Sequence, residues 1–577
     1  MKQSFFFIML LAAASTSASQ RSRHAMQAIA ENHFSQTVCV KAAGSNTGKA
    51  IKVDCVYEES GYAVFAPSTD DAFVILSKSD LTSPVLGYSQ SRFDPKDMPN
   101  DMRWYLSVVS RNIQEAELRN VELKSSRKAA TTPVEPFITT LWHQGDPYNL
   151  LTPKNYPAGC VAVAMAQCIN YCQYPGNVDF RGYAYCSESP GSKRYVVDSL
   201  DIQGIYFFPF LNIYGRATDR QKNSVAKLIR DCGYASYMQY DKNGSGTYNY
   251  LGGMAMTSCF KYPEECVKYA EQSYFNGTND DWNNIIYREM ALKSPVIYGA
   301  SDSIQGGHAF VLCGLDADGL VYVNWGWGGD GDGFFDIALM NPKGYNFIEG
   351  HDMIYGIRNQ PVEGDRAEPR IYSYDGEPYT LSLKEEKDDD GVMHKAIHIT
   401  STKGIINLTP CTMDGEFGIF GLDVTTGQPW QIIETDPTVL QPGSGYFLRE
   451  PAEIFYYYVE NQMIPGHTYR ISFGTRDKRE QVWHSVQAVG GEVAYDIYYT
   501  GDPATTTFSE RTEAYIVDGV KDIAASSASE TDGITRVYDI TGRLVYTAPT
   551  SRFNLQNVPA HGTLIVKRGK EVRKVIR

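Results

Sequence analysis

The sequence predicts an α+β protein with several domains, in which mixed regions come first and a strand-rich region follows. Near the N-terminus, strand-like runs at 61–66 and 72–77 precede a helical stretch at 102–123. An alanine-rich run of helix formers begins at residue 160. After residue 358, strands rich in Tyr, Ile and Phe are interrupted by Gly, Pro and Asp. With 577 residues, of which 43% are hydrophobic, the length alone suggests about three or four domains.

The first residues have the pattern of a secretory signal peptide, which we place at 1–19. Lys2 precedes an apolar run from Phe5 to Ala14, and small residues follow it. No other stretch contains the roughly 18–20 continuous apolar residues that span a bilayer. We therefore expect an exported chain that has no transmembrane segment.

The next region, residues 20–128, contains the strand-like runs and the helical stretch. It ends in a polar segment with helix breakers, Glu122 to Pro133, which we predict to be an exposed linker. A second domain then follows at 129–360.

Charge and cysteine content exclude some functions. A net charge of -14 without a basic cluster argues against a nucleic-acid partner. The chain has 11 cysteines, so at least one thiol stays unpaired. Cys259 could pair with Cys266, although the sequence alone leaves the pairing open. Cys168 and Cys172 are four residues apart on a predicted helix and lack zinc-site spacing, so we interpret them as core residues.

The thiol of Cys160 is the strongest candidate nucleophile. The turn-forming residues Pro157, Ala158 and Gly159 precede it, and the alanine-rich run begins with it, so it lies at a predicted helix N-terminus. The free N–H groups and the positive dipole end at this position favour the reactive thiolate. Most unpaired cysteines are buried core residues, and it is this position, together with the partners below, that distinguishes Cys160.

A base and an orienting residue follow at one end of a predicted hairpin. Two strand-like runs, 309–315 and 320–325, are joined by a turn signal at 316–319. Folding at this turn brings His308 close to Asn324, whose side chain can hold the imidazole as it takes the thiol proton. This order, with His roughly 130–150 residues after Cys, is that of papain-type peptidases.

Gln144 completes a catalytic set. It lies in a turn-rich segment shortly before Cys160, and its amide can donate to the oxyanion of a tetrahedral intermediate, with the Cys160 N–H as a second donor. His143 is a less favoured base, because the order Cys, His, Asn fits His308. The Asp330-Gly-Asp332-Gly segment lacks the other ligands of a calcium loop, so we interpret it as a turn.

Four segments in this order resemble the streptopain family of secreted cysteine peptidases. They begin at Gln144 (Gln-Gly-Asp-Pro-Tyr-Asn), Gly159 (Gly-Cys-Val-Ala), Gly307 (Gly-His-Ala-Phe-Val) and Val323 (Val-Asn-Trp-Gly-Trp-Gly-Gly). The resemblance extends over about residues 20–360 and implies a papain-like domain at 129–360 behind an inhibitory propeptide at 20–128.

The resemblance also implies roles for individual residues. Cys160 would be the nucleophile and His308 the base, and three further residues would support catalysis: Gln144, Asn324 and Trp325. Glycines beside His308 leave room for a substrate backbone. The segment 238–247 is similar to the cleft loop of the family, and the implied substrate contacts are Ser245, Gly246, Gly307 and Trp327. No metal or organic cofactor is implied. The expected partners are protein or peptide substrates and the chain's own propeptide.

Two further modules follow the predicted peptidase domain. Residues 365–515 are predicted to form a β-sandwich module without reactive clusters. A linker of small residues at 523–532 leads to the segment 533–577, which resembles the C-terminal sorting domain of type IX secretion. This resemblance implies export through the periplasm to the cell surface or medium, with the secretion machinery as a partner.

The sequence thus predicts a secreted cysteine endopeptidase made as a zymogen. Two alternatives remain open. A thiol acyltransferase or transglutaminase would use the same nucleophile on another acceptor, and an adhesin would depend on the C-terminal β modules.

Overall fold

The computed structural model describes residues 20–576 with several gaps. The gaps are 42–50, 69–70, 124–131, 187–194, 209–210, 212–216, 276, 303–305, 341–349, 374–378, 388–390, 402–403, 447–451, 459–462, 481, 515–533, 540–543, 550–562 and 569–570. The predicted signal peptide, most of the predicted linker before residue 132 and the linker at 523–532 lie outside the described residues.

The N-terminal region, residues 20–123, places its two helices on opposite faces of a small antiparallel sheet. Its elements are α1 (Arg23–Lys41), β1 (Val53–Glu58), β2 (Tyr62–Pro67), β3 (Phe73–Ser77), β4 (Val85–Ser89) and α2 (Asn100–Arg119). Side chains alternate between the two faces of a strand. In β2, Ala63 and Phe65 therefore pack toward α1, whereas Tyr62 and Val64 pack toward α2.

The central region, residues 132–358, combines helices with the rest of this sheet. Its helices are η1 (Pro153–Asn155), α3 (Cys160–Cys172), α4 (Asp219–Ala235), α5 (Asn249–Ser258), η3 (Gln272–Tyr274), α6 (Asn279–Ala291) and η4 (Ile337–Met340). Its strands are β5 (Val178–Cys186), β6 (Tyr195–Gly204), β7 (Lys268–Glu271), β8 (Val296–Asp302), β9 (Gly306–Leu315), β10 (Val321–Asn324), β11 (Gly333–Phe335) and β12 (His351–Tyr355). Thr218 and Thr278 form capping boxes that begin α4 and α6.

One ten-stranded sheet joins the N-terminal and central regions. Its strand order is β1-β2-β3-β4-β11-β10-β9-β8-β12-β7, so β4 and β11 form the junction between the two regions. Gly87 and Gly333 lie at this junction. A Cβ atom on Gly333 would lie 2.2 Å from the carbonyl oxygen of Tyr88, so only glycine permits this close pairing.

Helix α2 covers the face of the sheet that the two regions share. Trp104, Tyr105 and Val108 are buried in one cluster with Phe310 of β9 and Val323 of β10. The side chain of Asn112, further along α2, donates to the carbonyl oxygen of Leu339 at 2.8 Å. Helix α2 of the N-terminal region is therefore part of the core of the central region.

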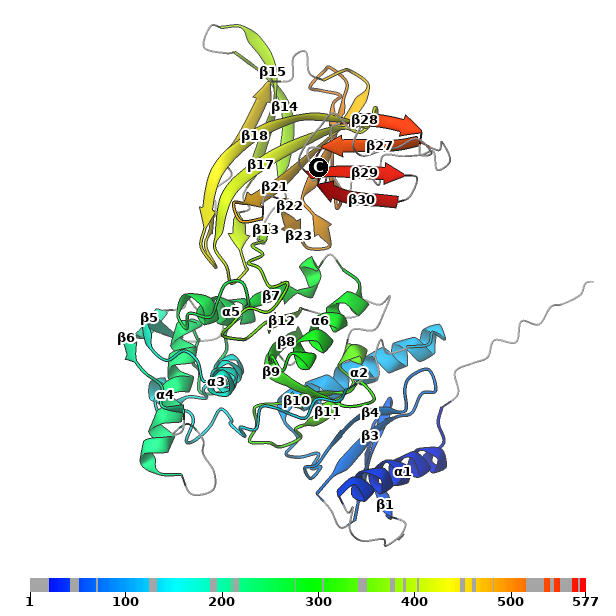
Figure 1. Cartoon of the computed structure of the whole chain (residues 1–577), viewed down its shortest axis with the longest axis vertical. Helices are drawn as coiled ribbons and strands as arrows, with labels where there is room; N and C mark the ends of the chain where they lie inside the picture. The colour runs from blue at the N-terminus through cyan, green and yellow to red at the C-terminus, as the bar shows by residue number, and fades with distance from the viewer. Residues whose placement is uncertain are drawn as a thin grey trace, which may run out of the picture.

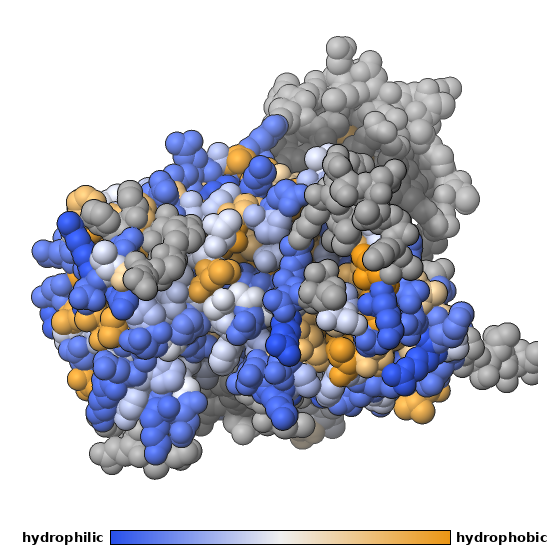
Figure 2. All heavy atoms as spheres, turned by 90° about the horizontal axis from the view of Figure 1, so that it is seen from below, coloured by the Kyte–Doolittle hydropathy of each residue, from blue (hydrophilic) through white to orange (hydrophobic). Residues whose placement is uncertain are grey.

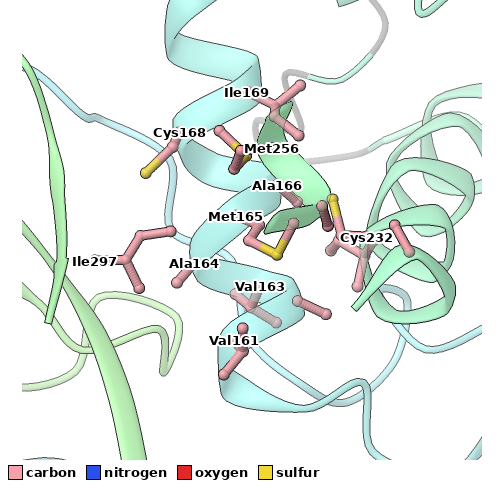
Figure 3. Packing of buried hydrophobic residues seen from close by; sticks show 14 of the residues in the cluster. Val161, Val163, Ala164, Met165, Ala166, Cys168, Ile169, Cys232, Met256 and Ile297 are labelled. Carbon is pink, nitrogen blue, oxygen red and sulfur yellow. The ribbon is translucent and has the colours of Figure 1, made fainter. Parts of the chain in front are cut away.

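Helix α3 lies on the opposite face of β8 and β9 and packs against α4 and α5 as well. Figure 3 shows Ala164 directed toward Ile297 of β8, and Met165 lying between α3 and the helices that carry Cys232 and Met256. This alanine-rich surface allows the helix to approach its neighbours closely.

The C-terminal region is built from strands. Its strands are β13 (Ile371–Ser373), β14 (Thr380–Lys387), β15 (Met393–Ser401), β16 (Ile405–Asn407), β17 (Met413–Asp423), β18 (Gln428–Leu440), β19 (Gly445–Tyr446), β20 (Ala452–Tyr458), β21 (His467–Asp477), β22 (Trp483–Ser485), β23 (Gln487–Ala488), β24 (Gly491–Glu492), β25 (Ala494–Tyr499) and β26 (Thr507–Arg511). They form sheets of five, three and six strands around one core. A four-stranded sheet follows, with β27 (Ile534–Asp539), β28 (Leu544–Pro549), β29 (Thr563–Arg568) and β30 (Glu571–Ile576).

The strand-rich region contacts the central region near α5 and β7, at the end of the molecule opposite α1 (Figure 1). Arg479 donates to Glu264 at 3.0 Å, and the rings of Tyr274 and Tyr372 meet edge to face. Figure 2 shows the other end, where hydrophilic residues predominate and apolar groups form small separate patches. No helix in the described part of the chain is long and apolar enough to cross a membrane.

The predicted mixture of helices and strands, with a strand-rich C-terminal part, is confirmed. The helix predicted at 102–123 corresponds to α2, and the predicted hairpin corresponds to β9 and β10. Helix α1 was not predicted. The pairing considered for Cys259 and Cys266 is wrong, because both cysteines are free. Cys168 is buried in the core as predicted, and Cys172 is partly buried against it.

The shared core predicts that Trp104 stabilises the central region as well as the N-terminal region. Trp104→Ala removes a side chain that is 0% exposed and should lower the free energy of unfolding by about 3–5 kcal/mol. Leu118→Ala on the same helix is the matched control, because Leu118 is 83% exposed and its loss should cost less than about 0.5 kcal/mol. Urea unfolding followed by circular dichroism measures both variants, and equal midpoints would contradict the shared core.

Candidate active site

Cys160 is the first residue of α3, as the sequence predicts. Gly159 precedes it with φ of 89°, a left-handed conformation that favours glycine. A Cβ atom at this position would lie 2.6 Å from the Met238 side chain and 3.2 Å from the carbonyl oxygen of Ser245. Glycine thus lets the helix that begins with Cys160 lie directly against the 238–247 loop.

The segment that carries Gln144 lies beside the start of α3. The backbone N–H of Ala158 donates to the carbonyl oxygen of Gln144 at 2.9 Å. On its other side, the carbonyl oxygen of Trp142 accepts from the N–H of Gly328 at 3.2 Å. The structure therefore brings Gln144 together with the Cys160 helix and with the loop after β10.

The predicted hairpin positions His308 and Asn324 at the same end of two paired strands. Asn324 lies opposite Val311, three residues from His308, and the turn between the strands closes at Gly319 with φ of 82°. The register thus agrees with the proximity that the sequence predicts.

His308 nevertheless points away from Cys160. Its neighbour Ala309 packs in the cluster that contains α3, whereas the next residue, Phe310, packs in the cluster that contains α2. Because side chains alternate along a strand, the imidazole of His308 lies on the α2 face, 6.1 Å from the indole ring of Trp104. Among the described residues, Nε2 of the imidazole has no hydrogen-bond partner.

Asp101 of α2 holds the imidazole on this face. Its Oδ1 atom accepts a hydrogen bond from Nδ1 of His308, and its Oδ2 atom accepts one from the indole Nε1 of Trp327 at 2.8 Å. Asp101 is only 2% exposed, so these two donors compensate a buried carboxylate. A residue of the N-terminal region therefore accepts the imidazole hydrogen bond that the sequence predicts for Asn324.

Asn324 has other partners in this structure. Its Oδ1 atom accepts from Nε2 of Gln167 on α3 at 3.1 Å and from the N–H of Gly326 at 3.1 Å, and its Nδ2 atom donates to the carbonyl oxygen of Thr140 at 2.9 Å. These contacts connect the end of the hairpin to α3 and to the segment that carries Thr140. Asn324 is thus fixed beside the site, although it does not contact His308 here.

The two predicted tryptophans lie in different surroundings. Trp325 is 1% exposed, and its indole donates to the carbonyl oxygen of Gly331 at 3.0 Å and packs on Phe310. Trp327 is partly buried and shares Asp101 with His308. The structure places Trp325 in the core and Trp327 next to the imidazole.

A cleft of about 400 Å³ lies on the α3 side of the sheet. It is lined by Val161, Gln239, Asp241, Gly244, Gly246, Thr247, Tyr248, Asn249, Gly299, Ala300, Gly307, His308, Ala309, Gly350 and Asp352. Of the four predicted substrate contacts, Gly246 and Gly307 line this cleft. Ser245 is buried behind it, with its Oγ atom accepting from the N–H of Asp241 at 3.3 Å, and Trp327 lies outside it.

The prediction that the helix start favours a Cys160 thiolate is wrong while Asp101 and the N-terminal region are in place. Burial, and secondly the negative charge of Asp101, raise the pKa of the thiol to about 12, although backbone N–H groups of Val161 and Ala309 lower it. The helix start therefore does not produce a thiolate while Asp101 and the surrounding core are in place.

The Asp330–Asp332 segment forms a turn in the structure. The carboxylate of Asp332 accepts from the backbone N–H of Trp325 at 2.8 Å, and burial raises the pKa of Asp332 to about 7. Within the described ranges, no group of three or more His, Cys, Asp or Glu side chains could hold a metal ion.

Two residues of the site were missed by sequence reasoning. Asp101 stands at the start of an ordinary amphipathic helix, and nothing local distinguishes it from other acidic first-turn residues. Gln167 had a signal, because it is a polar side chain within the apolar run 161–169, and it is 0% exposed in the structure.

The chain is similar to known cysteine peptidases. The Peptidase C10 family matches residues 142–335. The chain is 27% identical over 323 residues to the thiol protease/hemagglutinin PrtT of Porphyromonas gingivalis, a match that covers 52% of this chain and 37% of that protein. It is 29% identical over 341 residues to streptopain of Streptococcus pyogenes, covering 54% of this chain and 83% of streptopain.

Two solved structures are similar over the same part of the chain. A prointerpain A fragment of Prevotella intermedia, in a cysteine-to-alanine mutant form, is 31% identical, with 54% of this chain and 100% of the fragment covered and a TM-score of 0.48. Active interpain A of the same organism is 34% identical, with 40% of this chain and 97% of interpain A covered and a TM-score of 0.35. The chain is more than 30% identical in sequence to both Prevotella proteins over nearly their whole length. It therefore belongs to the peptidase C10, or streptopain, family of cysteine-type endopeptidases.

Proposed function

We propose that the chain is a secreted cysteine endopeptidase made as a zymogen, in which residues 20–128 are the inhibitory propeptide. The observation that carries this proposal is the position of Asp101, which binds the predicted base from a helix outside the predicted peptidase domain. The helix of the predicted nucleophile and the strand of the predicted base border one cleft, but the base is turned away from the nucleophile.

In the mature enzyme, catalysis begins when the imidazole of His308 moves to the α3 side of the sheet. Its Nε2 atom takes the proton of the Cys160 thiol, and Sγ forms a bond to the carbonyl carbon of the substrate. The backbone N–H of Cys160 and the side-chain amide of Gln144 donate to the oxyanion.

The tetrahedral intermediate then collapses to an acyl-enzyme. The C–N bond breaks, and His308 gives its proton to the leaving amine. Water attacks the thioester while His308 accepts one of its protons. The C–S bond breaks and the thiol is restored. Asn324 orients the imidazole in this cycle by accepting from Nδ1, the atom that Asp101 holds in the precursor.

One prediction of this mechanism concerns the catalytic set. Cys160→Ala should reduce hydrolysis of a peptide substrate by about 10⁴-fold or more, and His308→Ala should cost nearly as much, because the two residues act as a unit. Asn324→Ala should cost less, because it only orients the base. Steady-state kinetics on matured enzyme measure all three, and substantial hydrolysis by the Cys160 variant would exclude the mechanism.

Another prediction concerns latency. Asp101→Asn removes a negative charge that raises the pKa of Cys160, and it weakens the hold on His308. The thiol of this precursor should react with iodoacetamide at neutral pH at least about tenfold faster than that of the unsubstituted precursor.

Asp97→Asn is the matched control for this measurement. It removes the same charge from an exposed residue shortly before α2 and should leave the alkylation rate unchanged. The initial alkylation rate of Cys160 is followed by mass spectrometry of the peptide that contains it. Equal rates in all three precursors would mean that Asp101 does not keep the site latent.

A separate prediction concerns export. We propose that residues 533–577, which include the sheet β27–β30, act as the secretion sorting domain. Deleting them should leave folded, active enzyme in the periplasm, because the catalytic groups lie elsewhere. Cell fractionation with a peptidase assay measures this, and unchanged delivery to the surface or medium would exclude the sorting role.

A further inference from the structure

Part of the cleft wall is made of hydrogen-bond acceptors that the catalytic steps above do not use. Asp352 of β12 and Asn249, the first residue of α5, both line the cleft. The Nδ2 atom of Asn249 donates to Oδ1 of Asp352 at 2.8 Å, and the hydroxyl of Tyr269 donates to Oδ2 at 3.1 Å. The first of these bonds fixes the orientation of the Asn249 amide.

The strand register places this pair close to the reacting groups. Asp352 is paired with Gly299 of β8, which in turn is paired with Ala309 of β9, so the three residues form one row across the sheet. This row faces α3, since Ala309 packs in the α3 cluster. The residue next to Ala309 in the chain is His308.

Gly299 leaves the space that the pair occupies. A Cβ atom there would lie 2.0 Å from Nδ2 of Asn249 and 2.1 Å from Oδ1 of Asp352. Any other residue would push the two side chains away from the strand. The amide and the carboxylate therefore lie directly against the sheet, within the cleft.

The pair has more acceptors than donors. Asn249 is 5% exposed, and its Oδ1 atom has no hydrogen-bond partner among the described residues. A buried acceptor without a partner is costly, commonly by about 1–3 kcal/mol, so the site favours a ligand that donates. The described lining residues include two carboxylates, Asp241 and Asp352, but neither Lys nor Arg.

A cation would also favour the charged form of the carboxylate. Burial raises the pKa of Asp352 to about 7, while hydrogen bonds from Asn249 and Tyr269 lower it and the charge of Glu271 raises it. A positive group within a few ångströms would stabilise the ionised form. A guanidinium or ammonium group supplies both the charge and several donors.

We propose that Asn249 and Asp352 form a subsite that selects substrates with a Lys or Arg side chain close to the scissile bond. This inference rests on the proposed peptidase function and adds a substrate class to it. The carboxylate binds the cation, and the free Oδ1 atom of Asn249 accepts one of its remaining hydrogens.

The test uses fluorogenic peptides that vary one at a time at the two positions before the scissile bond. Mature enzyme is assayed at about pH 8, where Asp352 is ionised. We expect Lys or Arg at one of these positions to give a higher kcat/KM than norleucine. Asp352→Asn keeps the shape of the side chain and should reduce this basic-to-norleucine ratio about 10- to 100-fold.

Glu271→Gln is the matched control. Glu271 accepts from the same Tyr269 hydroxyl at 3.2 Å but does not line the cleft. Removing its charge lowers the pKa of Asp352, which is already ionised at about pH 8, so the ratio should stay within about twofold of the unsubstituted enzyme. An unsubstituted enzyme that cleaves basic and norleucine peptides equally, or an Asp352→Asn enzyme with an unaltered ratio, would overturn the subsite while leaving the peptidase function intact. An enzyme that hydrolyses no peptide would overturn both.

Discussion

The structure depends on the burial of one face of the ten-stranded sheet beneath helix α2. Trp104, Tyr105 and their neighbours fill the space over β9 and β10, and the strand pairing of β4 with β11 holds the N-terminal sheet in line. With that face covered, an imidazole projecting from β9 is enclosed by apolar groups, and Asp101 is the acidic partner that hydrogen-bonds to it. Apolar packing and one buried carboxylate thus determine the direction of His308 together.

The other face of the same strands carries the parts of the site that are already in place. Gln167 of α3 connects Asn324 to Thr140, so the hairpin, the helix of Cys160 and the segment leading to Gln144 form one hydrogen-bonded unit. Since this unit is complete in the presence of α2, the proposed activation needs a local change at the start of β9 that turns His308, rather than the assembly of a new site. In the proposed zymogen, Asp101 acts on both catalytic groups, because it holds the imidazole of His308 and helps to raise the pKa of Cys160.

Local signals explain which parts of the site could be predicted from the sequence. Gly159 followed by an alanine-rich run specifies the start of α3, and the Asp-Ala-Asp-Gly turn specifies the hairpin. The positions of Cys160 at the helix start and of His308 and Asn324 at one end of the hairpin were therefore predicted correctly. The bond between Asp101 and His308 joins residues 207 positions apart and depends on how a helix packs on a sheet. The raised pKa of Cys160 was missed for the same reason, because burial and a distant charge outweigh the helix dipole.

The junction between β4 and β11 has a consequence for the protein after maturation. If the N-terminal region leaves, β11 becomes the outermost strand, and its N–H and C=O groups lose their partners. Exposed strand edges recruit strands from other molecules and promote aggregation. β11 is only three residues long, Gly333–Phe335, and begins with a glycine, so it offers few groups for such pairing. A short edge of this kind would allow the enzyme to lose the four strands β1–β4 without aggregating through the exposed edge.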